Sequence, residues 1–196
     1  MSIQTRRERE RAERERLIVT AARELAETEG WDAVTTRRLA AEIEYSQPVL
    51  YSHFKGKDAI MAAVALEGFA EMATELRAAR QAAEGAGARA ALAAVSEAYT
   101  AFARRRPALY DAMFTHAVDL PFATLDAPAP LWAAYGELSA AVEPIAAAGD
   151  DPGILTETYW AGLHGLITLT RSGRLPEHAH TARLQLLTGH FAARVA

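Results

Sequence analysis

Apolar residues recur along most of the chain with the spacing of an amphipathic helix, and no alternating strand pattern lasts more than a few residues. The first helical stretch begins with an Arg/Glu run over 5–16, whose opposite charges pair across one helical turn. An apolar stripe of Leu17, Ala21 and Leu25 follows, and Gly30 is suited to end the helix. Helical periodicity continues to the end of the chain. The pattern therefore predicts an all-α protein with about nine helices.

Two short helices separated by a turn of about three residues are predicted next. Thr35 can cap a helix that carries Leu39, and Ser46 can cap a helix over 47–54 with Pro48 in its first turn. Two short helices in this order, preceded by an amphipathic helix, are typical of a helix-turn-helix. The second of them would enter the major groove of DNA.

Proline and glycine residues divide the rest of the chain into six further helices. The first is expected over about 58–81, the second ends at 104, and the third begins at Pro107. The fourth runs from Leu131 and bends or ends at Pro144, the fifth runs from Asp151-Pro152 to 172, and the sixth begins at Pro176. The stretch 119–130 contains three prolines and is the longest irregular segment.

Composition narrows the class of protein. The chain has 196 residues, 51% of them hydrophobic, and no cysteine, which excludes disulfides and Cys-based zinc sites. The N-terminus lacks a signal-peptide pattern, and no apolar run reaches the roughly 18 residues of a membrane span. We therefore expect a soluble, cytoplasmic protein without membrane contact.

The charge is unevenly distributed around a net value of −4. Residues 1–57 hold 11 Lys and Arg against 10 Asp and Glu, whereas residues 58–196 hold 10 against 15. DNA binding would therefore depend on a few well-placed basic groups rather than on a broad basic surface.

Residues 46–54, Ser-Gln-Pro-Val-Leu-Tyr-Ser-His-Phe, together with Lys57, resemble the recognition helix of TetR-family regulators and the start of the helix that follows it. Leu39-Ala40 resembles the apolar-Ala pair of the family's second helix. The resemblance covers about 15–62. It implies a helix-turn-helix DNA-binding domain over 1–57 and a helical ligand-binding and dimerisation domain over 58–196. The family usually has Gly in the turn where Glu44 stands, and Glu44 would be strained at positive φ.

The resemblance also implies DNA contacts. Gln47 and Val49 would face base edges, because an amide can pair with adenine and a methyl can touch thymine. Tyr51 and His53 would donate to phosphates, and Lys57 would contact the DNA backbone. The full set of candidates is Thr36, Arg37, Gln47, Pro48, Val49, Tyr51, Ser52, His53 and Lys57.

Several of these residues also have a plain structural interpretation. Tyr51 and Phe54 could both be core aromatics, and His53 could lie on the surface without a role. The arm with Arg6, Arg7 and Arg9 could lie beside the duplex, or it could be a solvated, ion-paired helix extension.

The segment Trp160-Ala161-Gly162-Leu163-His164-Gly165 resembles the Trp…His-Gly pattern of one C-terminal domain type in this family. Its small residues would let another helix approach closely. In the family the last two helices form a four-helix bundle with those of a second subunit, here about 151–172 and 177–194. The candidate dimer contacts are Leu163, Leu166, Ile167, Leu184, Leu187 and Phe191.

Aromatic, Met and His residues of the C-terminal domain are the candidates for an effector pocket. Most are expected to be core, although some must line any pocket that exists. His164 is either a satisfied core or interface histidine or a direct ligand contact. The candidates are Phe102, Tyr110, Met113, Phe114, His116, Trp132, Tyr135, Trp160 and His164.

Taken together, the sequence predicts a homodimeric repressor that binds a palindromic operator in double-stranded DNA. A small-molecule effector of unknown identity would shift the spacing of the two recognition helices, which a palindrome needs about 34–36 Å apart. The histidines are scattered and no catalytic motif is visible, so we expect no enzyme, cofactor or metal site. The alternative is a helical adaptor whose helix-turn-helix does not bind DNA.

Overall fold

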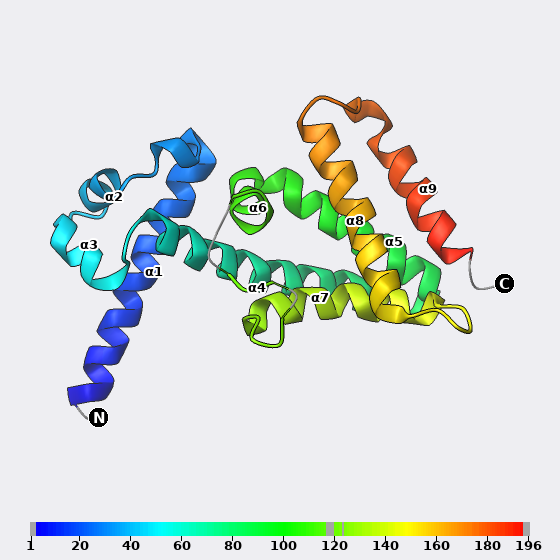
Figure 1. Cartoon of the computed structure of the whole chain (residues 1–196), viewed down its shortest axis with the longest axis horizontal. Helices are drawn as coiled ribbons and strands as arrows, with labels where there is room; N and C mark the ends of the chain where they lie inside the picture. The colour runs from blue at the N-terminus through cyan, green and yellow to red at the C-terminus, as the bar shows by residue number, and fades with distance from the viewer. Residues whose placement is uncertain (1–2, 117–119, 123, 194–196) are drawn as a thin grey trace. The chain divides into compact units, whose positions relative to one another are not determined.

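The computed structural model describes residues 3–116, 120–122 and 124–193 (Figure 1). Over these residues it contains nine α-helices and no strand, which confirms the all-α prediction. The helices are α1 (Ile3–Glu29), α2 (Thr36–Glu42), α3 (Gln47–His53), α4 (Lys57–Ala83), α5 (Ala88–Arg105), α6 (Pro107–Phe114), α7 (Ala129–Val142), α8 (Pro152–Arg171) and α9 (His180–Ala192).

Most helix ends follow local sequence signals. The Thr35 hydroxyl accepts a hydrogen bond from the Arg38 N–H at 3.1 Å, and the Asp151 carboxylate accepts one from the Ile154 N–H at 3.0 Å. Ser46 occupies the cap position of α3, but its side chain makes no capping hydrogen bond. The reason is that Pro48 has no N–H, while the Val49 N–H donates to the backbone carbonyl of Ser46 at 3.1 Å.

The chain divides into two compact units, Met1–Gly68 with Arg106–Pro128, and Phe69–Arg105 with Ala129–Ala196. These units do not coincide with the expected boundary before residue 58, because α6 packs with α1. The Glu27 carboxylate of α1 accepts hydrogen bonds from the Ala108 and Leu109 N–H groups at 3.1 and 2.9 Å. The Trp31 indole N–H donates to the Ala108 carbonyl at 2.8 Å. The functional division into 1–57 and 58–196 stays a prediction.

The first unit has its core where α1, α2 and α3 meet. Ile18, Leu39 and Leu50 come from these three helices, and all three side chains are fully buried. In Figure 1 α2 and α3 lie beside α1, in agreement with the contacts between them. Burial of large aliphatic side chains stabilises such a small helical cluster by about 1.5–3 kcal/mol per residue.

The second unit packs α5 against α7, α8 and α9. Its core includes the fully buried Tyr99, Phe102, Tyr159 and Leu163. Among the small residues of α8, Gly162 allows α9 to pack closely. A Cβ atom added at Gly162 would lie 3.0 Å from the Leu187 side chain of α9. The same addition at Gly165 would meet nothing within 4 Å. The close approach expected for this helix therefore occurs at Gly162.

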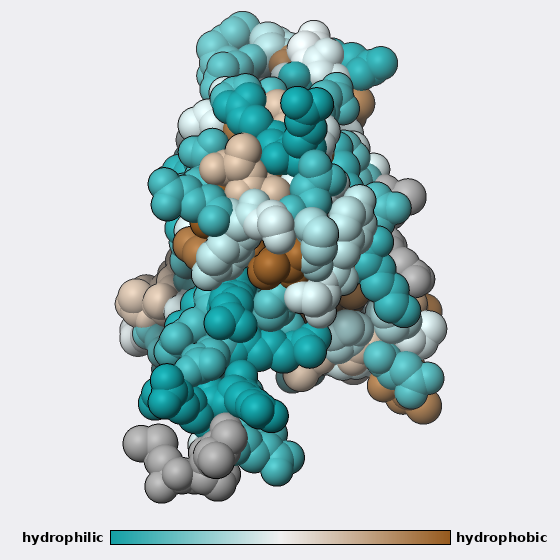
Figure 2. Space-filling model, turned by 90° about the vertical axis from the view of Figure 1, so that its left-hand side faces the viewer, coloured by the Kyte–Doolittle hydropathy of each residue, from teal (hydrophilic) through white to brown (hydrophobic). Residues whose placement is uncertain are grey.

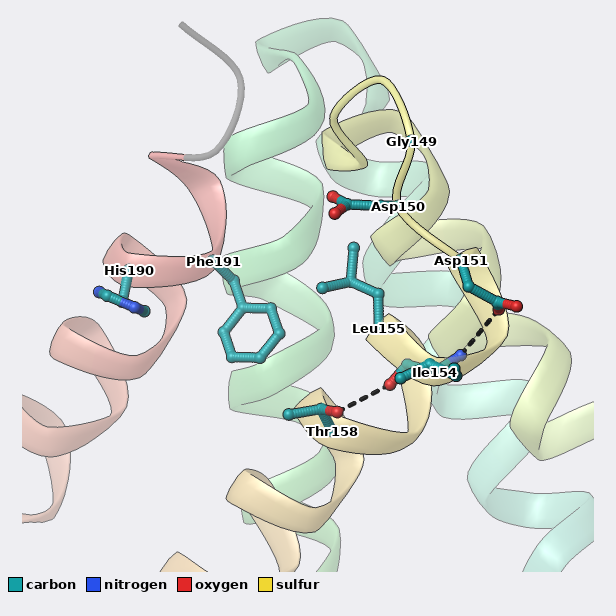
Figure 3. A pocket seen from close by; sticks show the side chains of 8 residues that line it. All are labelled: Gly149, Asp150, Asp151, Ile154, Leu155, Thr158, His190 and Phe191. Carbon is teal, nitrogen blue, oxygen red and sulfur yellow. Dashed lines mark hydrogen bonds between the residues drawn. The ribbon is translucent and has the colours of Figure 1, made fainter.

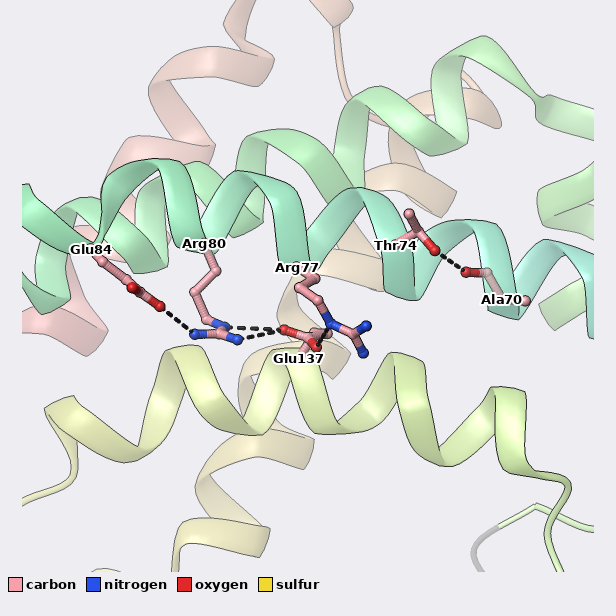
Figure 4. A network of polar contacts seen from close by, with 6 residues as sticks. All are labelled: Ala70, Thr74, Arg77, Arg80, Glu84 and Glu137. Atoms are coloured by element: carbon pink, nitrogen blue, oxygen red, sulfur yellow. Dashed lines mark hydrogen bonds and ion pairs between the residues drawn. The ribbon is translucent and has the colours of Figure 1, made fainter.

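A buried carboxylate joins α7 to the second half of α4 (Figure 4). Glu137 is 7% exposed, and its Oε1 lies 2.7 Å from the Arg77 Nε atom. The other oxygen, Oε2, lies 2.9 Å from Nη2 of Arg80, whose Nη1 atom also reaches Glu84 at 3.0 Å. Both oxygens of the buried carboxylate are thus paired with guanidinium groups.

Replacing Glu137 with Ala should lower the free energy of unfolding by about 2 kcal/mol, because Arg80, only 20% exposed, would lose its buried counter-charge. Arg77 contributes less to this loss, since it is 53% exposed and can turn toward water. Urea unfolding measures the change, with Glu97→Ala on the exposed side of α5 as the control. Equal losses in the two variants would contradict this role for Glu137.

Candidate nucleic-acid interface

Helix α3, the expected recognition helix, has one anchored side and one open side. Leu50 is fully buried beneath it, and Phe54 at its C-terminal end is half-buried. Val49 is 37% exposed and Tyr51 is 52% exposed. The exposed residues of this helix are Gln47, Pro48, Val49, Tyr51 and Ser52. These are five of the residues predicted to meet DNA.

The wider surface around α3 is mostly hydrophilic. Figure 2 shows the side of the molecule that lies on the left in Figure 1, and polar side chains cover most of it. Apolar side chains reach this surface only in small separate areas. A surface of this kind suits contact with a hydrated, charged partner such as a nucleic acid.

The turn between α2 and α3 is closed by two backbone hydrogen bonds. The Tyr45 N–H donates to the Ala40 carbonyl at 2.8 Å, and the Glu44 N–H donates to the Ala41 carbonyl at 3.3 Å. This pair of bonds is a Schellman motif, whose penultimate residue needs a positive φ. Glu44 has φ 58° and is the one non-glycine residue with a positive φ in the described part of the chain. The strain anticipated for Glu44 is therefore present, and the turn forms nonetheless.

The N-terminal end of α2 lies beside the open side of α3. The Thr36 hydroxyl and the Tyr51 hydroxyl form a hydrogen bond at 3.3 Å, and Arg37 is exposed next to Thr36. Two hydroxyls and a guanidinium can donate together to phosphate oxygens. The structure thus brings three of the predicted DNA contacts to one place.

His53 faces α1 rather than open solvent. Its side chain is 6% exposed, and its Nδ1 atom lies 3.3 Å from Glu15 Oε1. Burial alone would raise the pKa of Glu15, but hydrogen bonds from Arg11 and His53 outweigh burial and lower that pKa. His53 therefore ties the end of α3 to α1, and its phosphate contact stays a prediction.

Lys57 is also engaged within the chain. Its ammonium group donates a hydrogen bond to the Trp31 carbonyl, and the residue is half-buried. This contact holds the start of α4 against the segment that follows α1. A contact between Lys57 and the DNA backbone stays a prediction.

The N-terminal arm of α1 is ion-paired along its length. Arg6 lies 2.8 Å from Glu10, Arg9 lies 3.7 Å from Glu13, and Arg11 lies 2.8 Å from Glu15. Each pair spans one helical turn on an exposed surface. This arrangement favours the solvated, ion-paired helix extension over a dedicated DNA arm.

The candidate effector-pocket residues are divided between the two units. Tyr110, Met113, Phe114 and His116 belong to the first unit, and Phe102, Trp132, Tyr135, Trp160 and His164 belong to the second. Their exposure also differs. Phe102, Tyr110 and Met113 are buried, whereas Trp132 is 46% exposed and His116 is exposed. Their common role around an effector stays a prediction.

One polar contact in the second unit adds a residue that the sequence analysis missed. The Trp160 indole N–H donates to the Tyr99 hydroxyl at 2.9 Å, and the Trp160 and His164 rings lie 6.4 Å apart. Burial lowers the pKa of His164, so the neutral imidazole is favoured. Tyr99 lies three residues before Phe102 on α5, and this helical spacing was the available signal.

The predicted dimer contacts are mostly part of the core of a single chain. Leu163, Ile167, Leu184 and Phe191 are buried, and Leu166 and Leu187 are half-buried. The large apolar side chains that solvent reaches on α8 and α9 are Ile154 at 63%, Leu169 at 41% and Leu186 at 76%. The periodicity of α8 did not separate its inner face from its outer face, because both carry apolar residues.

In the part of the chain that the structure describes, no group of three His, Cys, Asp or Glu side chains is placed to hold a metal ion. None of the described helices is both long and apolar enough to cross a membrane.

Two family models match the sequence. Residues 18–64 match the model for bacterial regulatory proteins of the tetR family, and residues 92–190, just over half of the chain, match a Tetracyclin repressor-like C-terminal domain. The chain belongs to the TetR family. It has the helix-turn-helix DNA-binding domain of a TetR-family transcriptional regulator and a tetracyclin repressor-like C-terminal domain. The C-terminal match does not confirm the Trp…His-Gly type.

Individual relatives agree with this assignment. The chain is 44% identical over 50 residues to the class D tetracycline repressor of Escherichia coli. The aligned residues cover 26% of this chain and 23% of that protein. It is 32% identical over 98 residues to the uncharacterized HTH-type transcriptional regulator YobS of Bacillus subtilis, with 50% of each chain covered. The chain thus spans half or less of the length of these two relatives.

The fold also matches a solved structure over nearly its full length. A protein of unknown function from Rhodococcus sp. RHA1 aligns with a TM-score of 0.71 at 23% identity, covering 93% of this chain and 95% of that chain. This likeness concerns the fold.

Replacing Glu44 with Gly should raise the free energy of unfolding by about 0.5–1 kcal/mol, because a residue with a side chain at φ 58° is strained and glycine is not. Thermal or urea unfolding would show the gain. The matched control is Glu42→Gly in the helical region of α2, which should destabilise the protein. A loss of stability in both variants would argue against strain at Glu44.

Proposed function

We propose that this TetR-family regulator is a homodimeric repressor that a small-molecule effector releases from a palindromic operator. The proposal depends on one observation: α3 has a buried side and an exposed side. Leu50 anchors the helix from below, while Gln47, Val49 and Tyr51 remain exposed above it. A helix presented in this way can enter a major groove without any rearrangement of the unit.

Base recognition would come from the first turn of α3. Gln47 can pair with an adenine through its amide, and Val49 can contact a thymine methyl. The Thr36–Tyr51 hydroxyl pair and Arg37 would bind the neighbouring phosphates and fix the register of the helix.

Release would depend on α4, which belongs to both units. Its first part, up to Gly68, lies in the first unit, and its remainder lies in the second. In the second unit Glu137 holds α4 to α7 through Arg77 and Arg80. An effector bound in the C-terminal domain that displaces α4 would change the spacing of the two recognition helices. A preference of about 3 kcal/mol for the wrong spacing lowers DNA affinity more than a hundredfold.

Dimerisation would use the outer face of α8, together with α9. Ile154, Thr158, Ala161, Gly165 and Leu169 recur at helical spacing on the side opposite the buried residues of α8. Ala161 is exposed, and the space around Gly165 is open. A second helix can therefore approach the middle of this face closely, as a two-fold helical interface requires.

Replacing Gln47 or Val49 with Ala should weaken binding to the preferred operator by about tenfold each and relax the preference at one base pair, because each contact discriminates by about 1–3 kcal/mol. Selection from random double-stranded DNA, followed by binding titrations at several salt concentrations, would identify the operator and measure the loss. Gln81→Ala changes an exposed glutamine near the end of α4 and is the matched control.

The same selection tests the alternative function, a helical adaptor whose helix-turn-helix does not bind DNA. The strained turn at Glu44 is the observation that favours this alternative. Failure to enrich any palindrome, with no salt-dependent binding, would support the adaptor and reject the repressor.

Replacing Ala161 with Arg should convert the dimer to a monomer, because a long charged side chain would separate the two copies of α8 where they approach most closely. Analytical ultracentrifugation across a dilution series would detect the change. Gln81→Arg, on the exposed side of α4, is the control and should remain dimeric. A dimer that persists in the Ala161 variant would place the interface elsewhere.

A further inference from the structure

A pocket of about 440 Å³ lies between the loop before α8, the first turns of α8 and the last turns of α9 (Figure 3). Asp150 accepts a hydrogen bond from the Ala147 N–H at 2.9 Å, and Asp151 accepts one from the Ile154 N–H at 3.0 Å. The Thr158 hydroxyl donates to the Ile154 carbonyl at 2.8 Å. These three polar side chains are thus used by the protein itself, and they do not define a ligand.

The first unit offers a different case at the turn between α3 and α4. The chain contains two lysines, and both lie in this turn. Lys55 follows Phe54, the C-cap residue of α3, and Lys57 is the first residue of α4. A lysine carries a compact positive charge on a flexible stem and is a common partner of phosphate groups. Either lysine could therefore contact the DNA backbone, and the sequence analysis expected this contact at Lys57.

Lys57 is held inside the first unit. Its ammonium group donates a hydrogen bond to the Trp31 carbonyl, and the residue is half-buried. Trp31 is itself 6% exposed, and its carbonyl also accepts a bond from the Val34 N–H at 3.2 Å. If Lys57 turned toward a phosphate, the buried carbonyl would lose its charged donor, which costs free energy. Lys57 is therefore placed to position the start of α4.

Lys55 has no such commitment. It is exposed, and among the described residues it has no hydrogen-bond or ion-pair partner. Four Lys and Arg side chains occur between residues 30 and 60. Of these, Lys57 is engaged as described, and Arg38 lies 2.7 Å from Glu29. The uncompensated positive charges around α3 are therefore those of Arg37 and Lys55.

The length of α3 places Lys55 near the edge of a major groove. The helix has seven residues and spans about 10 Å, whereas the groove is about 12 Å wide. In the proposed complex, Gln47 and Val49 in the first turn meet the base edges. The C-terminal end of the helix then lies toward the rim of the groove, which the sugar-phosphate backbone forms. Lys55 follows directly at this end.

We propose that Lys55, rather than Lys57, is the lysine that binds the DNA backbone at the end of α3. The inference rests on the DNA binding proposed above, and it adds a residue that the sequence analysis did not place at the interface. The ammonium group of Lys55 pairs with a phosphate without first breaking a contact inside the protein, whereas Lys57 must give one up. Arg37 at the start of α2 and Lys55 at the end of α3 then hold the helix through two separate phosphates.

The salt dependence of DNA binding tests this contact. The full-length chain and its Lys55→Gln and Lys57→Gln variants are titrated with the selected operator and with an unrelated duplex of equal length. Lys55→Gln should weaken both complexes by about fivefold for each bound subunit at about 0.1 M salt, because one phosphate contact is lost. The slope of log affinity against log salt should fall by about one for each subunit. Arg174→Gln removes an exposed charge from the second unit and is the matched control.

The two lysines should also differ in stability and in reactivity. Lys57→Gln should lower the midpoint of thermal unfolding with little change in the salt slope, and Lys55→Gln should do the reverse. Acetylation with an N-hydroxysuccinimide ester, followed by peptide fragmentation, reports each lysine separately, since the chain has no others. A duplex concentration of about ten times Kd should slow the acetylation of Lys55 about tenfold, because only the free fraction reacts. The rate at Lys57 should not change.

An unchanged acetylation rate at Lys55 in the complex, or an unchanged salt slope in Lys55→Gln, would overturn the inference. A fall in slope in Lys57→Gln alone would assign the backbone contact to Lys57 instead. These outcomes are distinct from failure of the proposed repressor, which would show as a selection that enriches no palindrome. The unrelated duplex presents the same phosphates, so its complex still reports on Lys55 in that case.

Discussion

Burial of Leu50 under α3 is the interaction on which the DNA-binding unit depends. A helix of seven residues is far too short to be stable by itself in water, so α3 exists because its inner side packs on α1 and α2. Leu50 is the single fully buried residue of this helix and forms the anchor. The remaining side chains of its first turns therefore stay exposed, and a small helix can present several polar groups on a fixed backbone.

The turn before α3 sets the direction in which those groups point. The same two backbone hydrogen bonds close α8, where the Gly173 N–H reaches the Thr170 carbonyl at 3.0 Å and the Arg174 N–H reaches the Leu169 carbonyl at 2.9 Å. Gly173 has φ 70° there, whereas Glu44 takes the equivalent position at φ 58°. The hydrogen bonds and the packing of α3 thus impose the left-handed conformation even on a residue that disfavours it.

Local signals in the sequence predicted much of this fold because they act over a few residues. Thr35 and Asp151 begin their helices as expected, and Gly30 follows the last residue of α1. Contacts between distant residues were not predictable in this way. Nothing in the pattern showed that Glu27 would bind the first N–H groups of α6, or that Lys57 would be engaged by a carbonyl 26 residues earlier.

The candidate interface was predictable as a surface, but the electrostatic role of each residue was not. His53 and Lys57 make contacts inside the unit, and Arg6 and Arg9 of the arm pair with glutamates one turn away. Little uncompensated positive charge then remains to attract DNA of any sequence. In the proposed function, affinity for an operator would come mainly from groove contacts, from the hydroxyl donors and from the exposed Arg37, all of which depend on the placement of α2 and α3. Binding that depends on placement more than on charge is sensitive to small changes in helix spacing, and the proposed release by an effector requires this sensitivity.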